Sequence, residues 1–159
     1  KCLAPGFRVG WVAAGKHATK IQQLQMMSTV SASMPTQQAI ADYLSQGGYD
    51  THLRRLRLLL EQRRYRMLQA IQTHLPEDVK VNIPSGGYFL WLEFESTFDA
   101  NKLYHFALER GVSIAPGSMF STSSQFNHAF RLNSSFQWNS RTEKGMEIIG
   151  EGCRKLRRK

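Results

Sequence analysis

The sequence has only two cysteines, Cys2 and Cys153, and they lie near opposite ends of the chain. No Cys-x-x-Cys pair and no nearby group of histidines accompanies them, so the sequence predicts neither a disulfide scaffold nor a metal site. It also lacks an apolar run of about 18 residues, the length that a membrane-spanning helix needs. No secretory signal peptide is recognisable. These absences favour a soluble cytoplasmic protein with both thiols reduced.

Acidic residues are scarce, since 12 Asp and Glu stand against 21 Lys and Arg and give a formal charge of +9. The excess comes from two clusters: Arg54, Arg55, Arg57, Arg63, Arg64 and Arg66 in the middle, and Arg154, Lys155, Arg157, Arg158 and Lys159 at the end. Neither cluster alternates with the aromatic side chains that a single-strand nucleic-acid binder uses for stacking. We interpret both as solvated helical faces, with a contact to nucleic acid or to a partner as the alternative.

What is present is typical of a globular domain. Hydrophobic residues make up 42% of the 159 residues and aromatic residues 11%, which is enough to form a core. The chain has no initiating methionine and begins within a motif, so we expect a piece of a longer protein.

Apolar periodicity predicts a series of helices and strands. Helices are expected over residues 16–30, from residue 35 to Gly47, over 51–74, from Asp99 to Gly111, and from a capping box at residues 140–143 onward. Strands are expected over 7–13, 79–83, 88–94, 112–115 and 129–134. Both faces of the 88–94 strand are apolar, which indicates a central strand. The last helix places Cys153 on its apolar face, as a core residue and not a nucleophile. This order implies an α+β fold, with helices packed on a small mixed or antiparallel sheet and one long connecting helix.

The first residues combine two side chains that suit a phosphorylated aldehyde. Lysine forms Schiff bases once its amine is deprotonated, and the arginine fork binds phosphate. Lys1 and Arg8 are seven residues apart, and Pro5-Gly6 can reverse the backbone between them. The pair therefore indicates a site for such a ligand.

A third candidate lies on the strand over residues 129–134. Arg131 is flanked by Phe130 and Leu132, and a buried arginine needs an anionic partner. The residues alone leave two partners open: an internal carboxylate in a structural salt bridge, or an anionic ligand.

Three separated motifs resemble the fold-type I pyridoxal-phosphate aminotransferases. Lys1, Leu3, Pro5, Gly6, Arg8 and Gly10 match the motif Ser-x-Ser-Lys-x-Leu-x-Pro-Gly-x-Arg-x-Gly without its leading serines. Residues 84–91 together with 111–120 resemble the small domain, and residues 131–133, Arg-Leu-Asn, resemble the substrate-carboxylate motif. The resemblance implies that Lys1 binds pyridoxal 5′-phosphate covalently and transfers the catalytic proton, that Arg8 binds its phosphate, and that Arg131 binds the α-carboxylate of an amino acid.

The resemblance also implies a domain organisation. Residues 1–48 would be the C-terminal edge of the large cofactor-binding domain, residues 49–75 an inter-domain helix, and residues 76–159 the C-terminal small domain. The family's acidic partner of the pyridine nitrogen, its ring-stacking aromatic residue and its Gly-rich phosphate loop have no counterpart here. We therefore expect the isolated chain to be inactive, and the full-length protein to be a homodimer that takes an amino acid or amine.

Two kinds of parent protein fit these motifs. The run Tyr49-x-x-His52-Leu53-Arg54-Arg55-x-Arg57 resembles a signature of GntR-type transcriptional regulators of the MocR subfamily. In these regulators a winged-helix domain that binds DNA precedes an aminotransferase-like domain. The alternative is a free-standing aminotransferase of the aminoadipate or kynurenine type, and a third class is a basic α+β binding module. Whether the parent is an enzyme stays open at this point.

Overall fold

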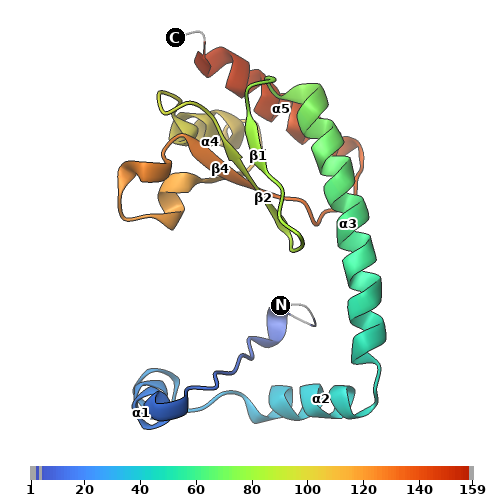
Figure 1. Ribbon diagram of the computed structural model, residues 1–159, viewed down its shortest axis with the longest axis vertical. Coiled ribbons are helices and arrows are strands. Elements are labelled where there is room, and N and C mark those ends of the chain that lie inside the picture. Colours follow the sequence, from blue (N-terminus) through green and yellow to red (C-terminus); the bar gives the residue numbers. More distant parts are fainter. Residues whose placement is uncertain (1–2, 4, 158–159) are drawn as a thin grey trace. The chain divides into compact units, whose positions relative to one another are not determined.

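The computed structural model describes residue 3 and residues 5–157 (Figure 1). Lys1, the predicted cofactor lysine, lies outside the described residues, as does Cys2. The chain divides into two compact units, Lys1–Leu56 and Arg57–Lys159, and the boundary falls inside the long helix α3, Tyr49–His74. The assignment of residues 1–48 to a large cofactor domain stays a prediction. None of the described helices is long and apolar enough to cross a membrane.

The first unit consists of short helical segments. Two 3-10 turns, Pro5–Phe7 and Gly15–His17, precede helices α1, Ala18–Thr29, and α2, Met34–Ser45. A proline in the first turn of α2 has the φ angle that a helix start requires. Both helices agree with the predicted ranges.

The prediction of a strand over residues 7–13 is wrong. Residues 8–14 are neither helix nor strand, and the Trp11 side chain is 90% exposed. A strand must pair its backbone N–H and C=O groups with a neighbouring strand. The four strands of the described chain all lie in the second unit, and none of them pairs with this segment. The segment therefore has the apolar pattern of a strand but pairs with none of the described strands.

The second unit contains a four-stranded antiparallel sheet in the order β1-β2-β4-β3. Its strands are β1, Lys80–Asn82, β2, Phe89–Glu93, β3, Ala115–Pro116, and β4, Ala129–Asn133. β2 is interior, as its two apolar faces predict. β3 keeps only Ala115 of the predicted 112–115 strand and adds Pro116, which has no N–H to extend the ladder further. Two short 3-10 turns, Gly117–Phe120 and Ser124–Phe126, follow β3.

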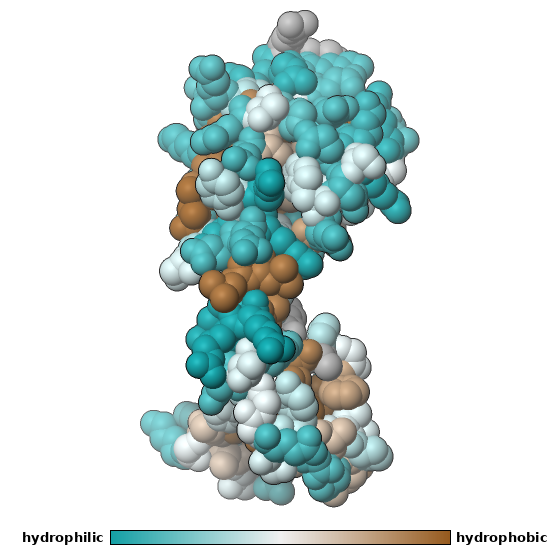
Figure 2. Space-filling view, turned by 90° about the vertical axis from the view of Figure 1, so that its right-hand side faces the viewer, coloured by the Kyte–Doolittle hydropathy of each residue, from teal (hydrophilic) through white to brown (hydrophobic). Residues whose placement is uncertain are grey.

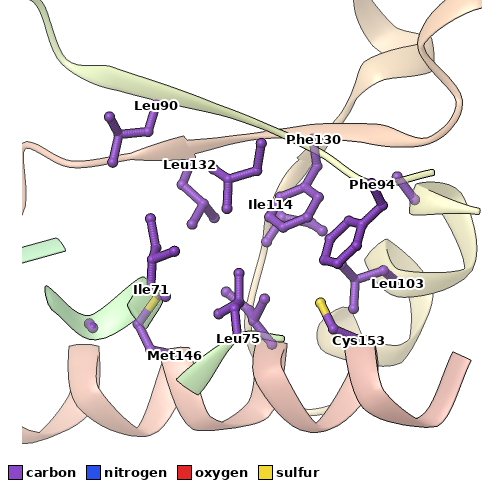
Figure 3. Close-up of a cluster of buried hydrophobic side chains, with 14 of the residues drawn as sticks. Ile71, Leu75, Leu90, Phe94, Leu103, Ile114, Phe130, Leu132, Met146 and Cys153 are labelled. Carbon is purple, nitrogen blue, oxygen red and sulfur yellow. The ribbon is translucent and has the colours of Figure 1, made fainter. Parts of the chain in front are cut away.

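One face of the sheet carries the hydrophobic core. Leu90 and Leu92 of β2 and Phe130 of β4 are fully buried, and they pack with side chains from α3, α4, Ala100–Leu108, and α5, Ser140–Arg157. Figure 3 shows the leucines of the sheet pointing toward Met146 and Cys153 of α5. Burying each such side chain stabilises the fold by roughly 1.5–3 kcal/mol. Because successive side chains of a strand point to opposite faces, the odd-numbered residues of β2 and β4 lie on the other face of the sheet.

The start of α5 differs from the predicted capping box. Asn139, and not Ser140, caps the helix, because its Oδ1 accepts the N–H of Thr142 at 3.0 Å. The Glu143 carboxylate binds other partners: it lies 2.5 Å from Nε2 of His74 and accepts the indole N–H of Trp138 at 2.9 Å. A tertiary contact to α3 thus replaces the local one that the sequence pattern predicts.

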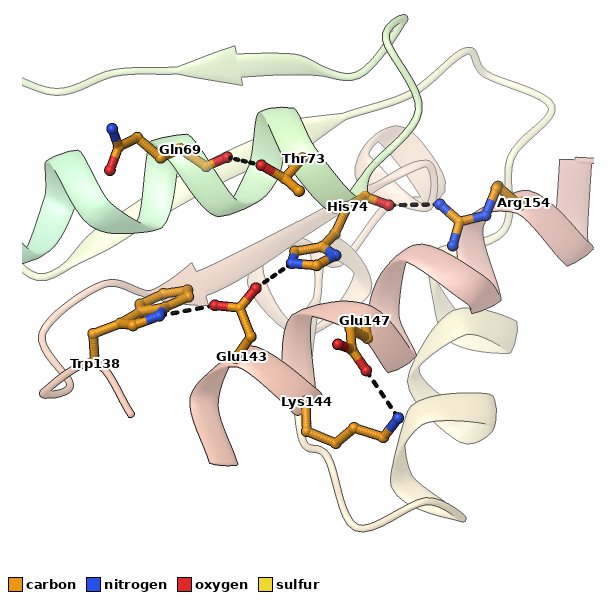
Figure 4. Close-up of polar contacts among 8 residues, drawn as sticks. All are labelled: Gln69, Thr73, His74, Trp138, Glu143, Lys144, Glu147 and Arg154. Carbon is orange, nitrogen blue, oxygen red and sulfur yellow. Dashed lines mark hydrogen bonds and ion pairs between the residues drawn. The ribbon is translucent and has the colours of Figure 1, made fainter. Parts of the chain in front are cut away.

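The helices α3 and α5 cross in close contact at the end of α3 (Figure 4). Besides the contact between His74 and Glu143, Nη1 of Arg154 donates to the backbone oxygen of His74 at 2.7 Å. Gly150 lies at the crossing, where an added Cβ would be 2.1 Å from that same oxygen. The backbones can approach this closely only because residue 150 has no side chain.

We predict that Gly150→Ala lowers the free energy of unfolding by about 2 kcal/mol, since the new methyl group forces the helices apart. Gly145→Ala in the same helix is the matched control. Its Cβ would meet nothing closer than 3.9 Å, so helix propensity should raise stability by about 0.5–1 kcal/mol. Urea denaturation of both variants measures the difference, and equal effects would contradict this account of the crossing.

Cys153 is a core residue, as predicted. Its side chain is fully buried, and burial raises the pKa of its thiol to about 12. An unfolded thiol ionises near pH 8.5, so between these two values the unfolded state binds fewer protons than the folded state. Stability therefore falls as the pH rises through this window.

We predict that this thiol alone contributes a loss of about 1.4 kcal/mol per pH unit between pH 9 and 11. Urea denaturation of the wild type and of Cys153→Ala over this range isolates the contribution. The variant should be less stable at neutral pH and should show a shallower pH dependence. Parallel pH profiles would show that the thiol ionises equally in both states.

Candidate ligand-binding face around Arg131

Arg131 lies on the face of the sheet opposite the core. It pairs with Trp91 across the β2–β4 ladder, and Phe89 pairs with Asn133 one step along the same face. The side chains of Arg131 and Trp91 are half-buried, whereas those of Phe130 and Leu132 on the other face are buried. The alternation that the sequence predicts for residues 129–134 is therefore confirmed.

Aromatic rings surround the guanidinium group. Its Cζ is 4.0 Å from the ring centroid of Phe89 and 4.4 Å from that of Phe120, distances typical of cation–π contacts. Trp91 makes edge-to-face contacts with Phe120 at 5.8 Å and with Phe126 at 5.6 Å. The indole N–H of Trp91 donates to Oε1 of Glu93 at 2.7 Å. Among the described residues, Arg131 thus contacts two rings and forms no ion pair with a carboxylate.

The segment that supplies Phe120 and Phe126 is tightly folded. Gly117 begins the first 3-10 turn, and a Cβ on it would lie 2.1 Å from the backbone oxygen of Phe126. Glycine is the residue that permits this approach. The approach brings the two turns together, so both rings reach Trp91.

The internal salt bridge that the sequence left open for Arg131 is not formed within the described part of the chain. The ion pairs found there join His74, Lys102, Arg110, Lys144 and Arg157 to their acidic partners. A half-buried arginine with ring contacts and no carboxylate keeps its N–H donors available. This arrangement suits an anionic ligand that approaches in the guanidinium plane.

The other two predicted site residues are less defined. Arg8 lies in the first unit, with an exposed side chain, and its backbone N–H donates to the oxygen of Pro5 at 3.3 Å. Its φ of 53° is unusual for a residue with a side chain, and such conformations concentrate at functional positions. Lys1 is outside the described residues. The roles of both residues therefore remain predictions.

The sequence reasoning missed the aromatic residues as functional candidates. The sequence pattern places Phe89 and Trp91 on the second face of a central strand, and Phe120 at the end of residues 111–120, which resemble the family's small domain. One signal could have identified Trp91. It alternates with the core residues of its own strand, as Arg131 does in the neighbouring strand, so both lie on the face of the sheet opposite the core.

The described residues of the two basic clusters form solvated helical surfaces for the most part, as interpreted from the sequence, and Arg158 and Lys159 lie outside the described residues. Arg54, Arg55, Arg57 and Arg66 are exposed on α3. Figure 2, which faces this helix, shows hydrophilic surface interrupted by a hydrophobic band. Some arginines have structural partners, since Arg63 donates to the oxygen of Ser135 at 2.5 Å and Arg157 lies 2.7 Å from Asp78.

Comparison with known proteins identifies the family. Residues 2–136 match the family described as aminotransferase class I and II. The chain belongs to this family. The described helices packed on a small antiparallel sheet superpose on part of its solved relatives, so the predicted α+β class is confirmed.

Among curated proteins, the HTH-type transcriptional regulator YdcR of Escherichia coli is 52% identical over 151 residues, which are 95% of this chain and 32% of YdcR. Aromatic-amino-acid aminotransferase 1 of Thermococcus litoralis is 30% identical over 152 residues, 95% of this chain and 36% of that enzyme. The chain thus spans about a third of the length of these relatives. The predicted resemblance to regulators of the MocR/GntR type is confirmed.

Among solved structures, the α-aminoadipate aminotransferase LysN of Thermus thermophilus superposes with a TM-score of 0.89 at 26% identity. The match covers 99% of this chain and 41% of LysN, which is complexed with N-(5′-phosphopyridoxyl)-L-leucine. Kynurenine aminotransferase of Pyrococcus horikoshii superposes with a TM-score of 0.86 at 28% identity, over 98% of this chain and 39% of that enzyme. The matched parts of these two aminotransferases therefore share the fold described above.

Proposed function

We propose that this chain is the C-terminal part of a pyridoxal-phosphate-dependent transcriptional regulator of the GntR/MocR type, and that it binds an amino compound as effector. The relation to YdcR supports this reading, because at 52% identity over 151 residues it is much stronger than the 30% identity to an aminotransferase. In this proposal, the DNA-binding domain belongs to the full-length protein, which is cytoplasmic and a homodimer.

The observation that carries the ligand-binding proposal is the environment of Arg131. Its guanidinium is held by Phe89 and Phe120 and has no carboxylate partner within residues 5–157. An internal ion pair would have satisfied the donors and closed the site. Without one, two parallel N–H donors can bind the two oxygens of a ligand carboxylate. We assign Arg131 to the capture of the effector's α-carboxylate.

The chain also provides residues that fit the cofactor. Arg8 is exposed and forms no ion pair with the described residues, so its guanidinium is available for a phosphate group. We propose that Arg8 binds the phosphate and that Lys1 holds the cofactor through its ε-amine and moves the proton at the ligand's Cα. Pyridoxal phosphate, when bound, supplies two groups: an aldehyde that reacts with amines, and an electron-poor ring that withdraws electrons.

The second candidate is a free-standing aminotransferase, which the 30% identity to the enzyme of Thermococcus litoralis favours. Both candidates would use Arg131, Arg8 and Lys1 in the same roles. They differ in the consequence of ligand binding, which is a change in DNA affinity for the regulator and amino-group transfer for the enzyme.

We predict that Arg131→Lys weakens binding of a carboxylate ligand about tenfold, because lysine cannot make the bidentate contact. Suitable probes for the cofactor-free, full-length natural protein are N-(5′-phosphopyridoxyl)glycine and N-(5′-phosphopyridoxyl)methylamine, which differ by one carboxylate. Calorimetric titration should show weaker binding of the glycine adduct only. Arg141→Lys, an exposed arginine on α5, is the control and should change neither affinity. Equal losses for both adducts in Arg131→Lys would contradict the assignment.

A further test separates regulator from enzyme. We expect the full-length natural protein to bind selected fragments of genomic DNA with an affinity that pyridoxal phosphate changes and that falls steeply with salt. Fluorescence anisotropy measures the affinity, and peptide mapping after borohydride reduction should locate the cofactor on Lys1. Rapid amino-group transfer without DNA binding would favour the free-standing enzyme instead.

A further inference from the structure

The guanidinium of Arg131 contacts two separate rings. Cζ is 4.0 Å from the centroid of Phe89 and 4.4 Å from that of Phe120. Phe89 packs against Tyr88, and Phe120 packs against Trp91, but these two phenylalanines do not contact each other among the described ring pairs. With two rings packed against it, the guanidinium presents its N–H groups to a ligand at its edge.

The two rings are supported differently. Phe89 belongs to the central strand β2, and its backbone is fixed by the ladder to Asn133 of β4. Phe120 ends a four-residue 3-10 turn and is 45% exposed, so its backbone is not part of the sheet. Its ring is held instead by the edge of Trp91, at 5.8 Å and an interplanar angle of 70°. The position of Phe120 thus depends on side-chain contacts.

Trp91 is itself fixed. Its indole N–H donates to Oε1 of Glu93, two residues along the same face of β2. A hydrogen bond to a carboxylate is among the stronger ones in proteins, so it restrains the indole ring. Contacts therefore run from Glu93 through Trp91 and Phe120 to the guanidinium of Arg131. Phe126 touches Trp91 at 5.6 Å but lies outside this series, because its ring does not contact Arg131 in the described structure.

We propose that Phe120 is a positioning residue for the ligand carboxylate. Its ring, held by Trp91, fixes the plane of the Arg131 guanidinium so that two N–H groups meet both carboxylate oxygens at once. A guanidinium that has lost one of its two ring contacts would rotate more freely and lose this alignment, and the benefit of a preformed fork would be reduced. The inference rests on the proposed binding of a carboxylate by Arg131 and adds a second residue to that function.

The experiment compares Phe120→Leu with Phe126→Leu. Both variants replace a ring that packs on Trp91 with an aliphatic side chain, but only the first removes a ring from Arg131. The readout is the ratio of the dissociation constants of N-(5′-phosphopyridoxyl)methylamine and N-(5′-phosphopyridoxyl)glycine for the cofactor-free, full-length natural protein. A merely structural defect changes both constants together and leaves the ratio unaltered.

We expect Phe120→Leu to lower this ratio about fivefold, the size of a typical cation–π contact. Phe126→Leu should keep the wild-type ratio, and Phe120→Tyr, which preserves the ring, should restore it. If the wild-type ratio is well above 1 and Phe120→Leu leaves it unchanged, the positioning role alone is overturned. A ratio near one in the wild type would overturn the proposed carboxylate binding itself, and the positioning role with it.

Discussion

The antiparallel ladder between β2 and β4 is the constraint on which the rest of this structure depends. Its register pairs Leu90 with Leu132 on one face and Trp91 with Arg131 on the other. Because successive side chains of a strand point to opposite faces, one pairing places the core and the candidate site back to back. A shift by one residue would bury the arginine among leucines and expose the core, so fold and site are specified by the same register.

The helices determine which face is buried. α5 presents Met146, Ile149 and Cys153 to the sheet, and its close crossing with α3 at Gly150 is secured on either side by Glu143 and Arg154. On the opposite face, the rings of Phe89 and Phe120 contact Arg131. The buried residues that α3, α4 and α5 contribute to the hydrophobic cluster thus pack on the core face of the sheet.

Much of this organisation was predictable from local patterns. The 26-residue helix α3, the interior position of β2, the two faces of β4 and the buried Cys153 all follow from apolar periodicity. The failures have one physical reason in common. The strand predicted over residues 7–13 lacks a paired edge, and Glu143 leaves its expected local cap for His74 and Trp138. In each case the outcome depends on a partner distant in sequence, which a local pattern does not contain.

The sequence by itself determined the family motifs, the candidate residues Lys1, Arg8 and Arg131, and the α+β class, because these depend on residue types at short spacings. Only the tertiary structure decided what surrounds Arg131. Phe89, Phe120 and Arg131 come from three segments that meet through the β2–β4 ladder and the turn at Gly117. Ring contacts over such separations arise when the chain packs, so whether this arginine would meet a carboxylate or an aromatic enclosure was settled by the fold.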